Sequence, residues 1–211
     1  MRQPAKSAAR VDVAVRAAVQ AYVQGGHQDW RELASFCDQH YVRHLVDESA
    51  NVEMMLICWK KGQASRVHNH GSSHCYLTVL SGGVEELRFT TGDTPLESEP
   101  TLAPRLPGVI AATSPCPLLL PDGVNHVCVG TTAYINDSMG LHAVRCDDAA
   151  CGGPGAEEGA VSLHIYAPPI RRVRLYEPEA DRVVTRAPGF RTIRGVEEED
   201  QMDASLLSST L

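Results

Sequence analysis

The chain has 211 residues, 43% of them hydrophobic, with 26 Asp and Glu against 19 Lys and Arg and a formal net charge of -7. This length suits one domain that buries roughly 70% of the surface of its unfolded chain, and the acidic balance lacks the positive field that nucleic-acid binding requires. No apolar run of the sequence approaches the ~20 residues of a membrane span, and its seven cysteines, without a CxxC pair, are typical of reduced thiols. We therefore expect a cytoplasmic monomer that binds neither nucleic acid nor membrane.

The predicted elements begin with helices. Apolar residues recur at helical spacing from residue 11 to about residue 37, and Gly25-Gly26 interrupts them. This pattern predicts two short helices, which we assign to an N-terminal segment, residues 1–40, packed on the rest of the domain.

Strands are expected from Tyr41 onward, where short runs rich in Val, Ile, Leu and Thr alternate with turn residues. Many short strands at close spacing indicate an all-β sandwich or barrel, here over residues 41–194. The clearest strands are 52–59, 76–80, 84–90, 118–120, 126–129 and 161–166. A Gly-rich loop is expected at 147–159, and the acidic, Ser-rich residues 195–211 are expected to form a disordered tail.

Histidine is unusually frequent, with nine residues, and two of them form a His68-Asn69-His70 motif. Histidines at positions i and i+2 of a strand point to one face, ~6.5 to 7 Å apart, so both can reach one metal ion. The motif resembles the first motif of the cupin family: a Gly, five residues, HxH, four residues, an acidic ligand, six residues and a second Gly. Gly62 and Gly82 match the flanking glycines, whereas Cys75 stands at the acidic position.

The missing carboxylate changes the charge of the expected site. In a site of two His and one carboxylate the protein supplies one negative charge to Fe(II). With a neutral third His the ion keeps its full charge, which favours a substrate that brings an anionic donor such as a thiolate. Cys75 is an alternative ligand. Two histidines compete for the third position: His126, which spacing favours because its PxGxxH setting resembles the second cupin motif, and His142, in a strand after a tight turn.

Four sequence blocks together resemble the cysteine dioxygenase family, which are iron enzymes of the cupin type. The blocks are Tyr41-Val-Arg43-His-Leu-Val-Asp47, Leu56-Ile-Cys58-Trp59, His68-Asn-His70-Gly-Ser-Ser-His74-Cys75-Tyr76-Leu77, and Tyr134-Ile-Asn-Asp-Ser-Met-Gly-Leu-His142 completed by Ala160-Val-Ser162-Leu-His164-Ile-Tyr166-Ala-Pro168-Pro169. The resemblance implies a cupin-type (jelly-roll) barrel with short N-terminal helices. It also implies oxidation of L-cysteine by O₂ to cysteine sulfinic acid, a step of cysteine catabolism.

The resemblance also implies the residues of the metal and substrate sites. It assigns Fe(II) to His68, His70 and His142, and so favours His142 over His126. Arg43 would pair with the substrate carboxylate, a role suited to a planar guanidinium, and Tyr41 would frame that pocket. The last 40 residues add little to the resemblance.

A further group implied by the resemblance is a hydrogen-bonded relay of Ser162, His164 and Tyr166, in which Tyr166 donates near the bound oxygen. The three residues alternate along one predicted strand and so share a face; by spacing alone, a polar ladder on a half-buried strand is the preferred explanation. In some family members the residues corresponding to Cys75 and Tyr166 are joined by a thioether, so this crosslink is possible here.

Other functions remain open at this point. A related group of enzymes acts on 3-mercaptopropionate, and cysteamine is a second alternative thiol. A non-catalytic cupin that binds a metal is the alternative outside the enzyme class. The ordinary interpretation of His74 is a packing residue, and that of Cys58 and Trp59 is core.

Overall fold

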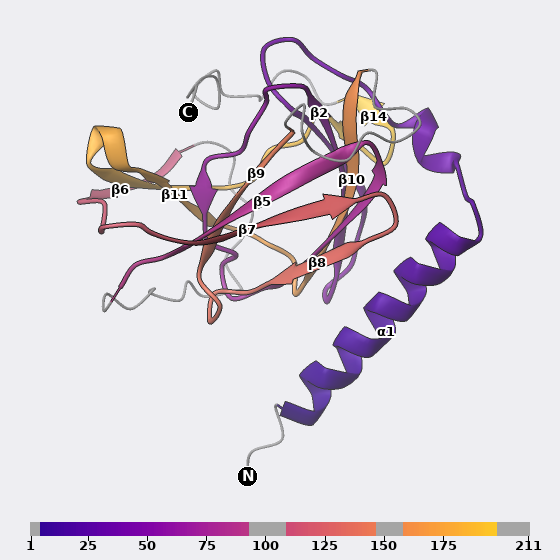
Figure 1. Cartoon of the computed structure of the whole chain (residues 1–211), viewed down its shortest axis with the longest axis horizontal. Helices are drawn as coiled ribbons and strands as arrows, with labels where there is room; N and C mark the ends of the chain where they lie inside the picture. The colour runs from indigo at the N-terminus through magenta and orange to yellow at the C-terminus, as the bar shows by residue number, and fades with distance from the viewer. Residues whose placement is uncertain (1–4, 93–108, 147–157, 198–211) are drawn as a thin grey trace.

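The computed structural model describes residues 5–92, 109–146 and 158–197, which form two β-sheets with helices at the N-terminal side (Figure 1). The first sheet has seven strands in the order β14-β13-β1-β2-β10-β4-β8, and the second has seven in the order β6-β12-β11-β3-β9-β5-β7. The strands of the first sheet are β1 (Val42–Glu48), β2 (Glu53–Lys60), β4 (His74–Ser81), β8 (Thr132–Ile135), β10 (Gly159–Ala167), β13 (Thr192–Ile193) and β14 (Val196–Glu197). Those of the second are β3 (Val67–His68), β5 (Gly83–Thr90), β6 (Val109–Ser114), β7 (Leu120–Cys128), β9 (Leu141–Arg145), β11 (Val173–Glu177) and β12 (Arg182–Arg186).

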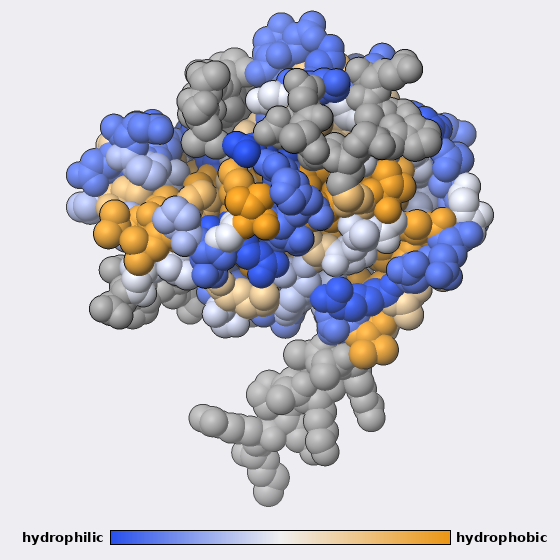
Figure 2. All heavy atoms as spheres, in the orientation of Figure 1, coloured by the Kyte–Doolittle hydropathy of each residue, from blue (hydrophilic) through white to orange (hydrophobic). Residues whose placement is uncertain are grey.

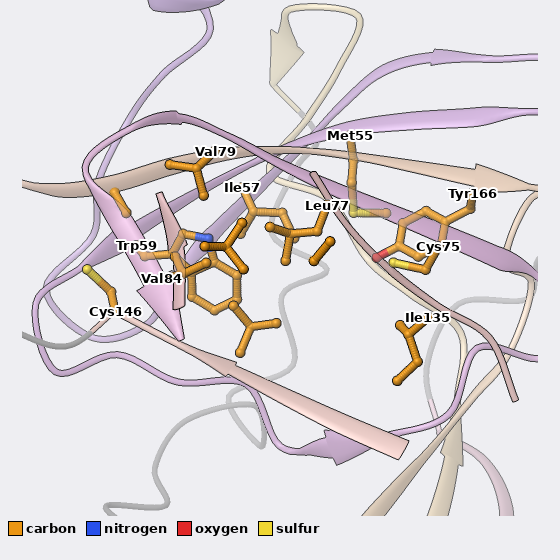
Figure 3. Close-up of a cluster of buried hydrophobic side chains, with 14 of the residues drawn as sticks. Met55, Ile57, Trp59, Cys75, Leu77, Val79, Val84, Ile135, Cys146 and Tyr166 are labelled. Atoms are coloured by element: carbon orange, nitrogen blue, oxygen red, sulfur yellow. The ribbon is translucent and has the colours of Figure 1, made fainter. Parts of the chain in front are cut away.

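This arrangement confirms the predicted all-β, cupin-type barrel. The largest core cluster lies between the two sheets and draws side chains from both, including Trp59 and Leu77 from the first sheet and Val84 from the second (Figure 3). Strand alternation sets this core, because successive side chains of a strand point to opposite faces. Every second residue of a strand therefore points into the space between the two sheets.

The central strands of the first sheet, β2, β4 and β10, are buried on both faces, which explains their nearly continuous apolar sequences. In β2, Met55, Ile57 and Trp59 face the interior. Leu56 and Cys58 face outward, against Trp30. Trp30 belongs to the short 3-10 helix η1 (Asp29–Glu32). The expected core positions of Cys58 and Trp59 are confirmed, and the two side chains lie on opposite faces of the sheet.

The N-terminal segment holds one α-helix rather than the two that the sequence predicts. Helix α1 runs over Ala5–Gln24, and only the 3-10 turn η1 follows it; a second 3-10 turn, η2 (Pro178–Ala180), connects β11 to β12. The described part of α1 packs on the outer face of the first sheet, with Val19 against Tyr76 and Ile165. The Gly25-Gly26 pair ends the helix because Gly26 has a positive φ of 65°, a conformation that favours glycine.

The strand boundaries differ most in the second half of the chain. Leu118 and Leu119 precede β7 rather than forming a strand, and residues 121–126, which resemble the second cupin motif, lie inside β7 with a bulge in its pairing to β5. The expected loop overlaps residues 147–157, which lie outside the described residues. The same holds for residues 198–211 of the expected tail, whereas Val196–Glu197 form β14.

On the face drawn in Figure 2, the exposed hydrophobic residues lie in small groups among hydrophilic ones. The helices that the structure describes include none long and apolar enough to span a bilayer. Among the described cysteines, Cys37, Cys58, Cys75, Cys116 and Cys146 are free, as predicted. Cys128 is disulfide-bonded, so the prediction of reduced thiols is wrong there.

Candidate metal centre

Three histidines converge between the sheets. His68 ends β3 and pairs directly with His142 on β9, while His70 follows two residues after His68. One ligand nitrogen of each ring lies within 4.8 Å of the others, and the ring centroids are 4.6 to 5.3 Å apart. His70 and His142 are fully buried. The structure thus brings together the three predicted ligands and includes neither Cys75 nor His126 in the cluster.

The hydrogen bonds of His68 and His142 leave one nitrogen of each ring free for a metal. His68 Nδ1 donates to the carbonyl oxygen of Arg66 at 2.8 Å, and His142 Nδ1 donates to a Glu86 carboxylate oxygen at 3.0 Å. A neutral imidazole that donates through Nδ1 presents the Nε2 lone pair. Partners of this kind orient metal-binding histidines in proteins generally.

His70 supplies the test of whether these residues fit a metal ion. Its buried Nδ1 has no hydrogen-bond partner in the described structure and lies 3.7 Å from Asp137 Oδ1, while its Nε2 is 3.0 Å from His142 Nε2. A proton on Nδ1 suits the nearby carboxylate, but two Nε2 lone pairs then face each other. A cation between them relieves that repulsion, so the donor set fits a metal that prefers imidazole.

Burial keeps His68 and His142 neutral in the metal-free protein. Burial is the main reason that the pKa of His68 falls to about 3, with the charges of His70 and Arg43 adding to it. Burial also lowers the pKa of His142 well below its usual value. Neutral imidazoles are the form that binds metal, so His68 and His142 are in their metal-binding form at neutral pH.

Glu86 is a functional candidate that the sequence analysis did not single out. The side chains of Glu86 and His142 are each 1% exposed, and Arg88 and Asn125 donate to the second Glu86 oxygen at 3.0 and 3.2 Å. The signal was present in the sequence: Glu85 and Glu86 are adjacent in a predicted strand, so one of them had to point inward. The sequence analysis also did not single out Asp137, whose carboxylate accepts hydrogen bonds from the backbone N–H groups of His70 and Ser72.

The rival histidines lie outside the cluster. His126 on β7 pairs with Glu85 on β5 and so shares its outward face; its Nδ1 is 3.2 Å from a Glu85 oxygen and its side chain is 56% exposed. Spacing, which favoured His126, was misleading because its motif lies within a strand. His74 bonds to the Tyr134 hydroxyl at 2.5 Å, as a packing residue would.

Cys75 and Tyr166 lie directly opposite each other on neighbouring strands, β4 and β10. Such pairs share a face, with Cβ atoms roughly 4.5 to 5.5 Å apart. Figure 3 shows the Cys75 side chain lying beside the Tyr166 ring, and both residues are buried. Burial raises the pKa of the Cys75 thiol and that of the Tyr166 hydroxyl; Cys75 raises the pKa of Tyr166 further, whereas the hydrogen bond with Tyr166 lowers the pKa of Cys75. Both groups are therefore protonated at neutral pH.

The three predicted relay residues form a hydrogen-bonded row on the interior face of β10. Ser162 Oγ is 2.9 Å from His164 Nε2, and His164 Nδ1 is 3.3 Å from the Tyr166 hydroxyl. The row continues to Trp59, whose indole nitrogen donates to Ser162 Oγ at 2.9 Å. The sequence analysis had given Trp59 a core position only.

Arg43 on β1 lies beside the histidine cluster. Its charge contributes to lowering the pKa of His164 to about 3, after burial and the charges of His68 and His70. Arg43 Nε and Nη2 donate to the carbonyl oxygen of Gly189 at 3.0 and 2.6 Å, so one guanidinium nitrogen, Nη1, is left for another partner. Tyr41, just before β1, stacks on Trp59 with ring centroids 4.6 Å apart.

Comparison with known families identifies the family of the chain. The sequence profile described as cysteine dioxygenase type I matches residues 5–179. The chain belongs to this family. The matched range contains the histidine cluster, the relay and Arg43, whereas Gly189 and Phe190, which hold the Arg43 guanidinium, lie beyond it.

Relatives in the cysteine dioxygenase family share about a third of the matched residues. The chain is 34% identical over 155 residues to "Cysteine dioxygenase type 1" of Danio rerio and 31% identical over 156 residues to the protein of that name from Homo sapiens. These matches cover 73% and 74% of this chain, and the chain spans 64% of the length of each relative.

Solved structures give weaker matches. A Klebsiella pneumoniae protein with a double-stranded β-helix domain has a TM-score of 0.46 and 17% identity over 70% of this chain and 93% of its own. An RmlC-like cupin protein from Desulfovibrio desulfuricans has a TM-score of 0.39 and 23% identity, over 65% of this chain and 91% of its own.

Glu86 provides the first prediction for this histidine cluster. Replacing Glu86 with Gln keeps the size of the side chain but removes the charge that orients His142, so metal affinity is expected to fall roughly 10-fold to 100-fold. Competition with a chelator measures the affinity. The matched control is Glu85→Gln, because Glu85 faces outward to Arg145 and His126; equal losses in both variants would contradict a specific role for Glu86.

Proposed function

We propose that this protein is an Fe(II)-dependent dioxygenase that oxidises L-cysteine with O₂ to cysteine sulfinic acid, as the names of its relatives suggest. The observation that carries the proposal is the cluster of His68, His70 and His142, which includes no carboxylate ligand among the described residues. Such a site favours a substrate that supplies its own anion, and a thiol is such a substrate. Bound Fe(II) would supply thiol deprotonation and O₂ activation.

Arg43 would select the substrate by binding its carboxylate. The Gly189 carbonyl occupies one edge of the guanidinium, and the Phe190 ring lies 5.7 Å from its carbon atom. These contacts hold the free Nη1 in a fixed direction, which reduces the entropy lost on binding. Tyr41, stacked on Trp59, would form the adjacent wall.

The relay would hold and orient the hydroxyl proton of Tyr166 during the reaction. Tyr166 is only 5% exposed, and burial keeps its pKa well above the usual value. The hydroxyl therefore acts as a hydrogen-bond donor at neutral pH rather than as a phenolate. Ser162 and His164 fix its position from behind.

We also propose that Cys75 and Tyr166 become joined by a thioether. The bond would form between the sulfur and the ring carbon next to the hydroxyl, with loss of two hydrogen atoms to O₂. The expected result is a second, faster band on a denaturing gel and a mass lower by two hydrogen atoms. Cys75→Ala should remove both signals, whereas Cys58→Ala, at a buried cysteine on the opposite face of the first sheet, should keep them. A single unshifted species after turnover with iron and cysteine would contradict the proposal.

Oxygen uptake with a thiol panel tests the main proposal. Iron-loaded protein should consume O₂ with L-cysteine and form the sulfinate, and should react more slowly with cysteamine, which lacks the carboxylate, and with 3-mercaptopropionate, which lacks the amine. Faster reaction with either analogue would assign that thiol as the substrate. No uptake with any thiol by fully loaded protein would instead favour a non-catalytic metal-binding cupin.

We further propose that the protein acts as a cytoplasmic monomer. All residues of the histidine cluster, the relay and the Arg43 site come from one chain, so no second copy is needed to complete them. Light scattering of the purified protein and cell fractionation test the two parts of this proposal.

A further inference from the structure

The direction of the hydrogen bonds in the relay is set at the end that lies farthest from Tyr166. The Trp59 indole N–H can only donate, so Ser162 Oγ must accept this bond, which is 2.9 Å long. Ser162 is fully buried, and the hydrogen-bond partners of its hydroxyl among the described residues are Trp59 and His164. The Ser162 proton must therefore go to His164, because otherwise a buried hydroxyl proton has no acceptor.

The same reasoning continues through the imidazole. Because Ser162 donates to His164 Nε2, that nitrogen must be unprotonated. His164 is neutral, since burial lowers its pKa to about 3, so its single proton is on Nδ1. This Nδ1 faces the Tyr166 hydroxyl oxygen at 3.3 Å. His164 then donates to Tyr166, and the hydroxyl proton of Tyr166 is not used within the relay.

We propose that Trp59 is a positioning residue that fixes this direction, so that Tyr166 presents its hydroxyl proton to the substrate or oxygen at the metal centre. The reverse direction, with Tyr166 donating to His164, would turn the proton away from the centre and leave the Ser162 proton unpaired. Trp59 suits the role because it is 1% exposed and its ring is held by stacking against Tyr41.

A consequence is that the relay ends without a proton acceptor. The indole nitrogen of Trp59 cannot take a proton from Ser162, so the row polarises the Tyr166 hydroxyl but carries no proton away along Trp59. The role of Tyr166 as a donor during oxidation rests on the proposed function, whereas the hydrogen-bond direction itself does not.

The experiment is ¹⁵N NMR of the His164 side chain in protein loaded with Zn(II), which is diamagnetic and needs no turnover. We expect the Nδ1–H tautomer in the unmodified protein. Trp59→Phe, which removes the donor, should produce a measurable population of the Nε2–H tautomer, because Ser162 is then free to accept from His164. Incorporating benzothienylalanine at position 59 replaces the indole N–H by sulfur at nearly unchanged shape, and should give the same result even if Trp59→Phe perturbs the fold.

The matched control is Trp30→Phe, which changes the other tryptophan on the outer face of the first sheet and should leave the tautomer unchanged. An Nε2–H tautomer in the unmodified protein would overturn the inferred direction, and an unchanged tautomer after loss of the Trp59 donor would overturn the role of Trp59.

Kinetics separate this inference from the proposed function. In the iron-loaded protein, benzothienylalanine at position 59 should lower kcat for L-cysteine by roughly 2-fold to 10-fold, the effect of one hydrogen bond, with little change in KM. An unchanged kcat alongside a changed tautomer would overturn the catalytic part of the inference. If no thiol is oxidised by any form, the proposed function fails, yet the NMR result still decides the hydrogen-bond direction.

Discussion

Replacing His142 with Ala is expected to abolish stoichiometric iron binding. The variant removes one of three converging nitrogens and leaves His70 Nε2 without the group that faces it at 3.0 Å. Loss of a partner behind a ligand costs roughly 10-fold to 100-fold in affinity, so loss of the ligand itself should exceed about 100-fold. Metal analysis after dialysis measures the bound iron, and oxygen uptake with L-cysteine should fall in parallel.

The control for this experiment is His126→Ala, because His126 is the histidine that motif spacing favoured. Its side chain is largely exposed on the outer face of β5 and β7, so the variant should retain full iron content and activity. Loss of iron in His126→Ala together with retention in His142→Ala would refute the proposed ligand set.

The second large effect is expected for Arg43→Gln. Glutamine keeps a polar side chain but loses the charge and the guanidinium donor that would bind the substrate carboxylate. Charged hydrogen bonds contribute about 1.5 to 3 kcal/mol each, so kcat/KM for L-cysteine should fall by roughly 100-fold. Cysteamine has no carboxylate, and its kcat/KM should change little.

Comparing kcat/KM for L-cysteine with kcat/KM for cysteamine distinguishes a role of Arg43 in substrate binding from a role in the fold. A uniform loss with both would show that Arg43 supports the fold rather than the substrate. Arg191→Gln is the matched control: Arg191 lies in the same C-terminal segment as Gly189, but its side chain is half-exposed and contacts Glu197. Its backbone N–H, which donates to the Arg43 carbonyl oxygen at 2.8 Å, is unaffected by the change.

The alternation of residues along strands predicted much of the site. His68 and His70, and Ser162, His164 and Tyr166, were placed on common faces by a period of two, and the structure brings each group together. Periodicity does not depend on which strands become neighbours, so it can be read from one segment alone. Choosing His142 over His126 required the family resemblance, because that choice depends on the pairing of β3 with β9.

The contacts that hold the site residues in place could not be predicted from local sequence patterns. Glu86 reaches His142 from a neighbouring strand, and Gly189 reaches Arg43 across 146 positions of sequence. Neither contact follows from the spacing of residues within a segment, because both depend on strand order. The prediction of a second helix was wrong for a related reason. In residues 29–37, Trp30 packs against the first sheet from a short 3-10 turn, and the segment does not form an amphipathic α-helix.

The pairing of β1 with β13 has a consequence for how the protein is made. His44 and Leu45 pair with Thr192 and Ile193 in a parallel register, and His44 Nδ1 lies 2.9 Å from the Thr192 hydroxyl, 148 positions away. During synthesis the histidine cluster and the relay are complete once β10 has emerged, whereas Arg43 still lacks the Gly189 carbonyl that orients it. A nascent chain therefore contains the three clustered histidines well before it contains the segment that orients the Arg43 guanidinium.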